Sequence, residues 1–221
     1  VTVPANGYKF ITFTDEEKGT WVRIKSDKNA KKVTAAFTYR NIDTRSYKGI
    51  QGGEARTVCS WVKVPKDFSL KQGFGIISWG NSTKTGETWQ ISVNPLEKDG
   101  EVGRLRLGLR GSQIIGNSDL RDGLWHHIAV VLYGGSNPNI GTHALLYVDG
   151  KKESVSRASL QEVKTTSNHD DHGLWVGRNV TYKDDERQPL HGGFFRGGVD
   201  DLYIFNVALS QNEIQSLMEK K

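Results

Sequence analysis

The sequence predicts an all-β protein: two antiparallel sheets packed face to face, with a short helix at the C-terminal end. Three observations predict this class. Short runs of alternating apolar and polar residues recur along the chain, separated by clusters of Gly, Asn and Asp. A helical period appears only after residue 209. Glycine accounts for 25 of the 221 residues and methionine for one, a composition that favours a loop-rich β protein over a helical one.

The strands are expected where the alternation is clearest. Trp125–Leu132 is apolar on both faces and is therefore predicted to be a central, doubly buried strand. Asp149 and Gly150 between two apolar runs predict a type I′ hairpin turn. The full set of predicted strands is Lys9–Phe13, Trp21–Ser26, Lys32–Tyr39, Arg56–Val64, Phe74–Trp79, Thr88–Val93, Arg104–Arg110, His126–Leu132, His143–Val148, Gly173–Gly177 and Gly198–Phe205.

The helix at the end has a clear start signal. Ser210 is followed three residues later by Glu213, which is the spacing of a capping box. Leu209 before the cap and Ile214 after it occupy the positions of a hydrophobic staple. A short helix is therefore expected from about Gln211, packed on the sandwich.

Charge and cysteine content set limits on the partners. The net charge is +5 and the pI is about 9.2, which favours anionic partners, although a soluble surface with excess lysine is an equal alternative. No arginine-rich tail or basic amphipathic helix appears, so nucleic acid is not expected as a partner. No apolar run approaches the ~18 residues of a membrane span, so no membrane insertion is expected. Cys59 is the single cysteine and is expected to be a buried thiol.

Five segments, taken in order and spacing, resemble the laminin G-like proteins of the concanavalin A-like lectin/glucanase superfamily. They are Arg56–Val62, Ile76–Gly80, Asp122–Val130, Leu146–Lys151 and Gly198–Ser210. The resemblance covers about residues 50–221 and implies a jelly-roll β-sandwich. We expect residues 1–221 to form a single domain, with 50–221 as its core and 1–45 as an N-terminal β extension. This fold hosts lectins, adhesion modules, glycosidases and lyases, so it does not by itself determine function.

One strand carries a stripe of arginines. Because side chains alternate along a strand, Arg104, Arg106 and Arg110 share one face, the three leucines between them face the core, and Gly108 leaves room beside the guanidinium groups. The resemblance implies that the outer face of one sheet is a concave ligand groove. There the guanidinium forks would suit a carboxylate or sulfate on a sugar. The alternative is a solvated convex face.

Other candidate sugar contacts are amides and aromatic rings. Gln90 and Asn94 belong to a polar row that alternates with apolar residues. Trp79 and Trp175 lie at strand ends and are candidates for stacking on a pyranose ring, with core packing as the alternative. Trp61 and Trp125, inside strands, are expected in the core. Three residues of a polar loop region complete the candidate binding set: His172, Arg178 and Tyr182.

A metal is implied only by the resemblance. Members of this superfamily often hold a structural Ca²⁺ through the first Asp of the closing-strand motif and backbone oxygens, and that Asp is Asp200 here. The alternative is a carboxylate satisfied by an arginine or by backbone N–H groups. His169 and His172 could form a transition-metal pair, but a solvated loop is the default interpretation. His126 and His127 face opposite ways, and we expect them to be structural.

Together these features predict a secreted carbohydrate-binding module for an anionic polysaccharide, uronic or sulfated, on a bacterial surface, in the periplasm or outside the cell. No catalytic residue is assigned, because the Glu-x-Asp-x-x-Glu pattern of the retaining glucanases of this fold is absent. A monomer or one part of a larger multidomain enzyme is expected. Two alternatives remain open: a jelly-roll polysaccharide lyase acting on a uronate-containing polysaccharide, and a protein-binding adhesion module.

Overall fold

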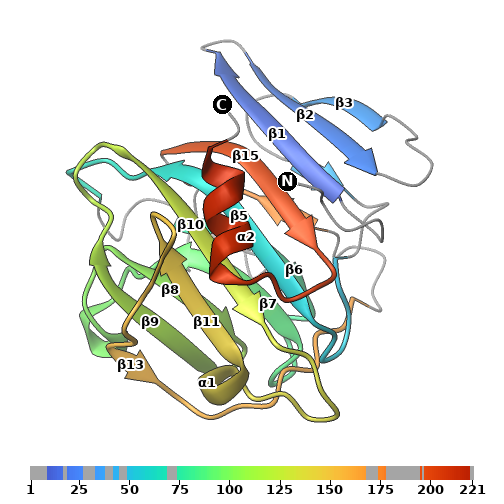
Figure 1. The fold of residues 1–221 in the computed structure, drawn as a ribbon, viewed down its shortest axis with the longest axis vertical. Coiled ribbons are helices and arrows are strands. Elements are labelled where there is room, and N and C mark those ends of the chain that lie inside the picture. The colour runs from blue at the N-terminus through green and yellow to red at the C-terminus, as the bar shows by residue number, and fades with distance from the viewer. Residues whose placement is uncertain are drawn as a thin grey trace.

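The computed structural model describes the backbone of residues 9–16, 19–26, 33–37 and 42–44. It describes backbone and side chains of residues 49–68, 74–167, 174–177, 195 and 197–219. Within these residues the chain forms two antiparallel sheets in two layers and a short C-terminal helix (Figure 1). The predicted fold class, a two-sheet antiparallel β-sandwich, is confirmed.

The first sheet has eight described strands. Their order across the sheet is β12 (Lys151–Lys152), β11 (Ala144–Val148), β10 (Trp125–Leu132), β5 (Arg56–Lys63), β15 (Gly198–Phe205), β1 (Lys9–Glu16), β2 (Gly19–Ser26) and β3 (Val33–Phe37). β10 lies inside the sheet between β11 and β5, and its residues from His127 onward are buried. The prediction of a central, doubly buried strand is therefore confirmed for that part of β10.

The second sheet has seven described strands. Their order is β13 (Arg157–Ala158), β9 (Ser112–Asp119), β8 (Arg104–Leu109), β7 (Thr88–Val93), β6 (Gly75–Gly80), β14 (Leu174–Val176) and β4 (Ile42–Thr44). β1 pairs with β15 and β4 pairs with β14, so strands from the first 44 residues join both sheets. The division into an extension at 1–45 and a core at 50–221 stays a prediction.

The main hydrophobic core lies between the two sheets. Leu105 and Leu107 of β8 are fully buried in it and Leu109 is 6% exposed, as their alternation with the arginines predicts. Trp79 and Trp89 are also fully buried there, with ring centroids 5.8 Å apart. Side chains that point away from this core are therefore the ones available for a binding site.

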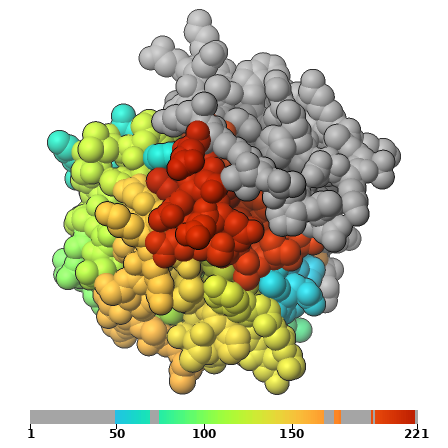
Figure 2. All heavy atoms as spheres, in the orientation of Figure 1, coloured from blue at the N-terminus to red at the C-terminus, as the bar shows by residue number. Residues whose placement is uncertain are grey.

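A second apolar cluster lies on the outer face of the eight-stranded sheet, beneath α2 (Gln211–Met218). Ile214 and Leu217 of the helix pack there with Leu209. The helix begins with the predicted capping box: the Ser210 hydroxyl accepts from the backbone N–H of Glu213, and the Glu213 carboxylate accepts from that of Ser210. Figures 1 and 2 show the helix over the middle of this face.

Other short elements complete the fold. A 3₁₀ turn covers Glu97–Asp99, and α1 covers Ile140–His143. Asp149 and Gly150 have φ values of 49° and 69°, the positive values that the predicted type I′ turn requires. No helix among the described residues is long and apolar enough to cross a membrane.

The strand β9 was not predicted from the sequence. Its two adjacent isoleucines face opposite sides, yet both are buried: Ile114 lies in the core, whereas Ile115 faces outward and is covered by the loop at Gly100. A strand covered on both sides loses the apolar–polar alternation by which strands are recognised.

Candidate functional site

The outer face of the seven-stranded sheet carries polar side chains aligned across several strands. The register places Gln90 of β7 beside Ser78 of β6, and Gly108 of β8 between Gln90 and Gln113 of β9. In the next row, Arg106 lies between Ser92 of β7 and Ile115 of β9. Adjacent side chains on one face of a sheet are close enough to bind one ligand together.

A pocket of about 410 Å³ opens over these rows. The sheet contributes Gln90, Arg106 and Gln113 to its lining, and Arg110 follows β8 at the turn. A loop before β8 contributes another wall, including Pro95, Lys98 and Asp99. The charged lining therefore consists of three cationic side chains and one carboxylate, which gives the pocket a positive balance.

Arg106 is the central charged group of the pocket. Its Nη1 lies 3.5 Å from Ser92 Oγ and its Nη2 lies 3.3 Å from Gln113 Oε1, two long contacts with neutral acceptors. Its Nε, and Gln90 Nε2 beside it, are buried with no hydrogen-bond partner among the described residues. Burial lowers the pKa of Arg106, and the nearby carboxylate of Asp99 opposes that effect. Unsatisfied buried donors are costly, so an acceptor from a ligand would be stabilised here.

The family model for the concanavalin A-like lectin/glucanase superfamily matches residues 38–215. The chain belongs to this superfamily. The match begins at residue 38, whereas the resemblance seen in the sequence begins at about residue 50. A search of curated proteins found no relative of the chain.

Solved structures show the same fold at low sequence identity. The CBM40 module of the Ruminococcus gnavus IT-sialidase, bound to α2,3-sialyllactose, is 12% identical with a TM-score of 0.50, over 80% of this chain and 96% of that one. Its complex with α2,6-sialyllactose is 13% identical with the same TM-score and coverage. A candidate carbohydrate-binding protein from Bacteroides ovatus is 16% identical with a TM-score of 0.53, over 89% of this chain and 54% of that one.

The loop that forms one wall of the pocket is held by Asn94. The side-chain amide nitrogen of Asn94 donates to the carbonyl oxygens of Leu96, Gly100 and Glu101 at 3.1, 2.8 and 2.9 Å. Asn94 is fully buried. Its donor is therefore used to fold the loop against the sheet, and the described structure does not support its predicted role as a direct sugar contact.

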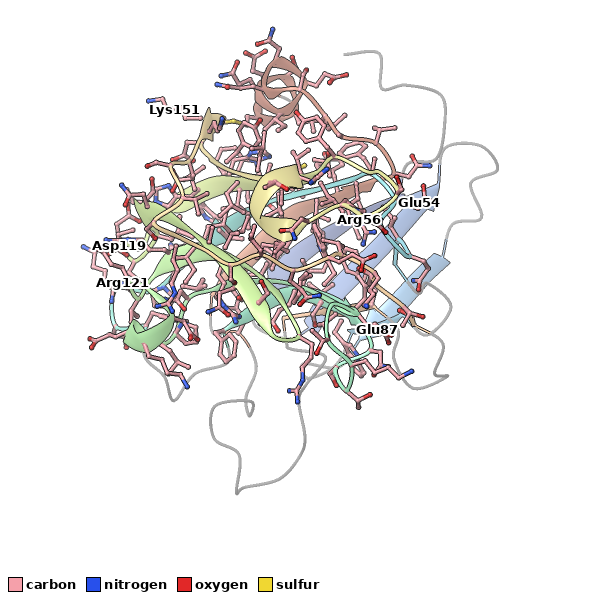
Figure 3. All side chains as sticks on the ribbon, turned by 90° about the horizontal axis from the view of Figure 1, so that it is seen from below. Glu54, Arg56, Glu87, Asp119, Arg121 and Lys151 are labelled. Carbon is pink, nitrogen blue, oxygen red and sulfur yellow. The ribbon has the colours of Figure 1, made fainter. Side chains whose placement is uncertain are left out.

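The three predicted arginines occupy different environments. Arg104 forms ion pairs with Glu101 and with Asp119 Oδ2, the latter at 2.8 Å. Asp119 is also paired with Arg121, whose hydrogen bond is the main cause that lowers the pKa of this carboxyl (Figure 3). Arg110 is exposed at the pocket rim. Only Arg106 and Arg110 of the stripe line the pocket.

The two predicted aromatic contacts, Trp79 and Trp175, also lie in different environments. Trp79 is fully buried and its indole N–H donates to the carbonyl oxygen of Ile50 at 3.0 Å, so its ring is not available to stack on a sugar. Trp175 is half-buried and pairs with Ser78, in the same row as Gln90. The remaining candidates lie outside the described residues: His172, Arg178 and Tyr182. His169 also lies there.

The described residues around Asp200 do not form a cluster of metal ligands. Its Oδ1 accepts from the backbone N–H of Asp201 at 2.9 Å, which is the alternative that the sequence left open. No group of three His, Cys, Asp or Glu side chains that could hold a metal occurs in the described part of the chain. Calcium binding at Asp200 therefore stays a prediction, and a site there would depend on backbone oxygens as well.

Sequence reasoning missed several residues of the site. Gln113 lies on the unpredicted strand β9, and the loop with Lys98 and Asp99 contains no recognisable motif. A period-two pattern of polar residues in Ser112–Asp119 is interrupted by Ile115, so the sequence offered only the Gly111 turn as a signal.

Proposed function

We propose that this chain is a carbohydrate-binding module that recognises an acidic glycan through the pocket around Arg106. The single observation that supports this most strongly is the half-buried guanidinium of Arg106, which has no bonded carboxylate among the described residues and only two long contacts to neutral groups. A ligand carboxylate or sulfate supplies the short, charge-assisted acceptors that this group lacks.

The surrounding residues support a sugar ring rather than a free anion. The amides of Gln90 and Gln113 can exchange hydrogen bonds with hydroxyl groups, and Pro95 provides apolar surface beside them. The similar R. gnavus module is bound to sialyllactose, an oligosaccharide that carries one carboxylate. A glycan ligand of this kind is also the basis for proposing that the chain acts outside the cell.

The test is calorimetric titration with acidic oligosaccharides, both uronic and sulfated, alongside sialyllactose. Arg106→Ala should weaken binding by about 10- to 100-fold, because a hydrogen bond to a charged group contributes ~1.5–3 kcal/mol. Arg106→Lys should recover only part of this loss, since a lysine lacks the bidentate fork. Lys152→Ala removes the same charge from the exposed edge strand β12 of the other sheet and serves as the control.

Two results would contradict this function. If no acidic glycan binds at low salt, the pocket does not have the proposed ligand. If Arg106→Ala and Lys152→Ala weaken binding equally, net charge rather than the pocket accounts for it.

No described residue favours either alternative. The pocket lining contains no His or Tyr within the described ranges, so no base for β-elimination is seen there. The lyase alternative stays a prediction, tested by following the absorbance of unsaturated products with uronate polysaccharides. The adhesion alternative is tested by protein pull-down with glycan binding as the comparison.

A further inference from the structure

Trp125 occupies the outer face of the eight-stranded sheet, on the opposite side of the sandwich from the Arg106 pocket. Its neighbours at alternate positions in β10, Ala129 and Val131, pack in the cluster beneath α2. Beyond that cluster, at the start of the strand, Trp125 is 41% exposed. The prediction that Trp125 belongs to the core is therefore wrong, and a large aromatic surface faces solvent.

The indole ring is held against backbone. The register pairs Trp125 with Lys63 of β5, and Lys63 with Gly198 of β15. A Cβ added at Gly198 would lie 2.3 Å from Cη2 of Trp125 and 2.8 Å from its Cζ2. The ring therefore crosses β5 and contacts the bare backbone of Gly198, which only glycine permits.

The turn that precedes Trp125 is also anchored. Asp122 Oδ1 accepts from the backbone N–H of Leu124 at 2.7 Å, and Asp122 Oδ2 lies 3.0 Å from His126 Nε2. On its other side, His126 Nδ1 lies 2.8 Å from Asp149 Oδ2. Burial alone would lower the pKa of His126, but the two hydrogen bonds and charges raise it. These contacts hold the turn before any ligand arrives, which reduces the entropy lost on binding.

Polar residues lie near Trp125 in the sheet and in the preceding turn. Lys63 is exposed directly opposite Trp125, and the side chain of Lys66 lies 3.7 Å from a Cβ placed at Gly123 in the turn. Asp200 lies on β15 two residues beyond Gly198, on the same face. A fixed aromatic ring with hydrogen-bonding residues on neighbouring strands can receive the apolar C–H face of a pyranose together with its hydroxyl groups.

We propose that Trp125 is the stacking platform of a second carbohydrate site, which binds a neutral pyranose unit of an oligosaccharide, with Lys63 donating to its hydroxyl groups. This goes beyond the proposed function, and shares with it only the premise that the partner is a glycan. Because the two sites face opposite ways, one molecule can engage two glycan chains, or two parts of one branched chain, with a gain in avidity.

Titration of the intact chain with cellohexaose and mannohexaose, followed by tryptophan fluorescence and calorimetry, tests the proposal. Trp125→Ala should lower the association constant at least about tenfold, consistent with the loss of an aromatic stacking contact. Trp125→Phe should retain part of the affinity. Gly198→Ala should also weaken binding although Trp125 itself is retained, because the added methyl displaces the indole ring. Thermal melting of each variant checks that the fold is intact.

The outcomes separate this site from the pocket. Arg106→Ala should leave the binding of the neutral oligosaccharides unchanged, whereas Trp125→Ala should leave the binding of acidic glycans unchanged. The proposal is overturned if neither neutral oligosaccharide binds, or if both bind Trp125→Ala as well as the unmodified chain. It is also overturned if Trp125 is needed only for binding to phosphatidylcholine vesicles, which would make Leu124 and Trp125 a membrane contact.

Discussion

The guanidinium of Arg106 lies over Gly108 on the same strand. A Cβ added at Gly108 would lie 3.0 Å from Nη1 of Arg106 and 3.1 Å from its Cζ. The missing side chain thus leaves the space in which the guanidinium lies along the sheet toward Gln113. The position of the Arg106 guanidinium therefore depends on residue 108 being a glycine.

Substitution of Gly108 by alanine should therefore disturb the pocket without disturbing the strand. The guanidinium would have to shift by a few tenths of an ångström, and we expect a loss of about 3- to 10-fold in affinity for an acidic glycan, or ~1 kcal/mol. Calorimetric titration checks this value. Gly135→Ala, where a Cβ would meet nothing within 4 Å, is the matched control. An equal loss of affinity in both variants would show that Gly108 does not position Arg106.

Substitution of Asn94 by aspartate should remove the hydrogen bonds that hold the loop at one wall of the pocket. The variant replaces a donor by an acceptor that faces three carbonyl oxygens within 3.1 Å. We expect a loss of ~2–4 kcal/mol in the free energy of unfolding and faster hydrogen exchange at the amides of residues 96–103. Asn206→Asp, at an exposed position, should change neither measurement. Unchanged exchange in the loop would show that Asn94 does not hold it.

Arg56 is expected to contribute to stability rather than binding. It is fully buried and donates to the carbonyl oxygens of Glu54, Ile50, Gln51 and Gly52 and to a threonine hydroxyl (Figure 3). A lysine cannot reach all of these acceptors with one ammonium group. Arg56→Lys should therefore lower the free energy of unfolding, measured by urea denaturation, by ~3 kcal/mol.

The control for that change is an exposed arginine. Arg121 forms a surface ion pair with Asp119. Arg121→Lys should lower the free energy of unfolding by no more than ~1 kcal/mol. Equal losses for the two variants would show that the buried position of Arg56 adds nothing.

His127 should make stability depend on pH. Burial lowers the pKa of this histidine to about 4, although the Asp149 carboxylate opposes the shift. The unfolded chain binds the proton near pH 6.5, so the folded state loses ~3 kcal/mol as the pH falls from 6.5 to 4. His127→Gln, which cannot be protonated, should show a shallower slope over this window in urea denaturation. Parallel curves for the two proteins would contradict the prediction.

Calcium binding at Asp200 remains to be tested by metal removal. If the closing strand holds the ion, 1 mM Ca²⁺ should raise the melting temperature relative to excess chelator, since a ligand that binds only the folded state stabilises it. Asp200→Asn should remove the difference. The same melting temperature with Ca²⁺ and with chelator would rule out a structural ion there.

The tryptophans show where local pattern stops being informative. Its place at the end of a strand makes Trp79 a candidate for stacking on a sugar, with core packing as the alternative; in the structure its N–H donates to the carbonyl oxygen of Ile50 inside the protein. Trp125 was assigned to the core because it starts an apolar strand, yet it lies past the end of the cluster that α2 covers. In both cases a segment distant in sequence determines the exposure of the ring.

The amino-acid sequence is enough to predict the two-sheet fold, the inward leucines and outward arginines of β8, the Asp149–Gly150 turn and the capped C-terminal helix. These depend on alternation along one strand or on contacts within four residues, which are visible in a linear chain. Only the folded chain shows that Arg104 is paired with Asp119, that Asn94 holds a loop, and that Arg106 lines one pocket with Gln90 and Gln113. These contacts join different strands and loops. The register of those strands is set by packing of the whole sandwich rather than by any local pattern.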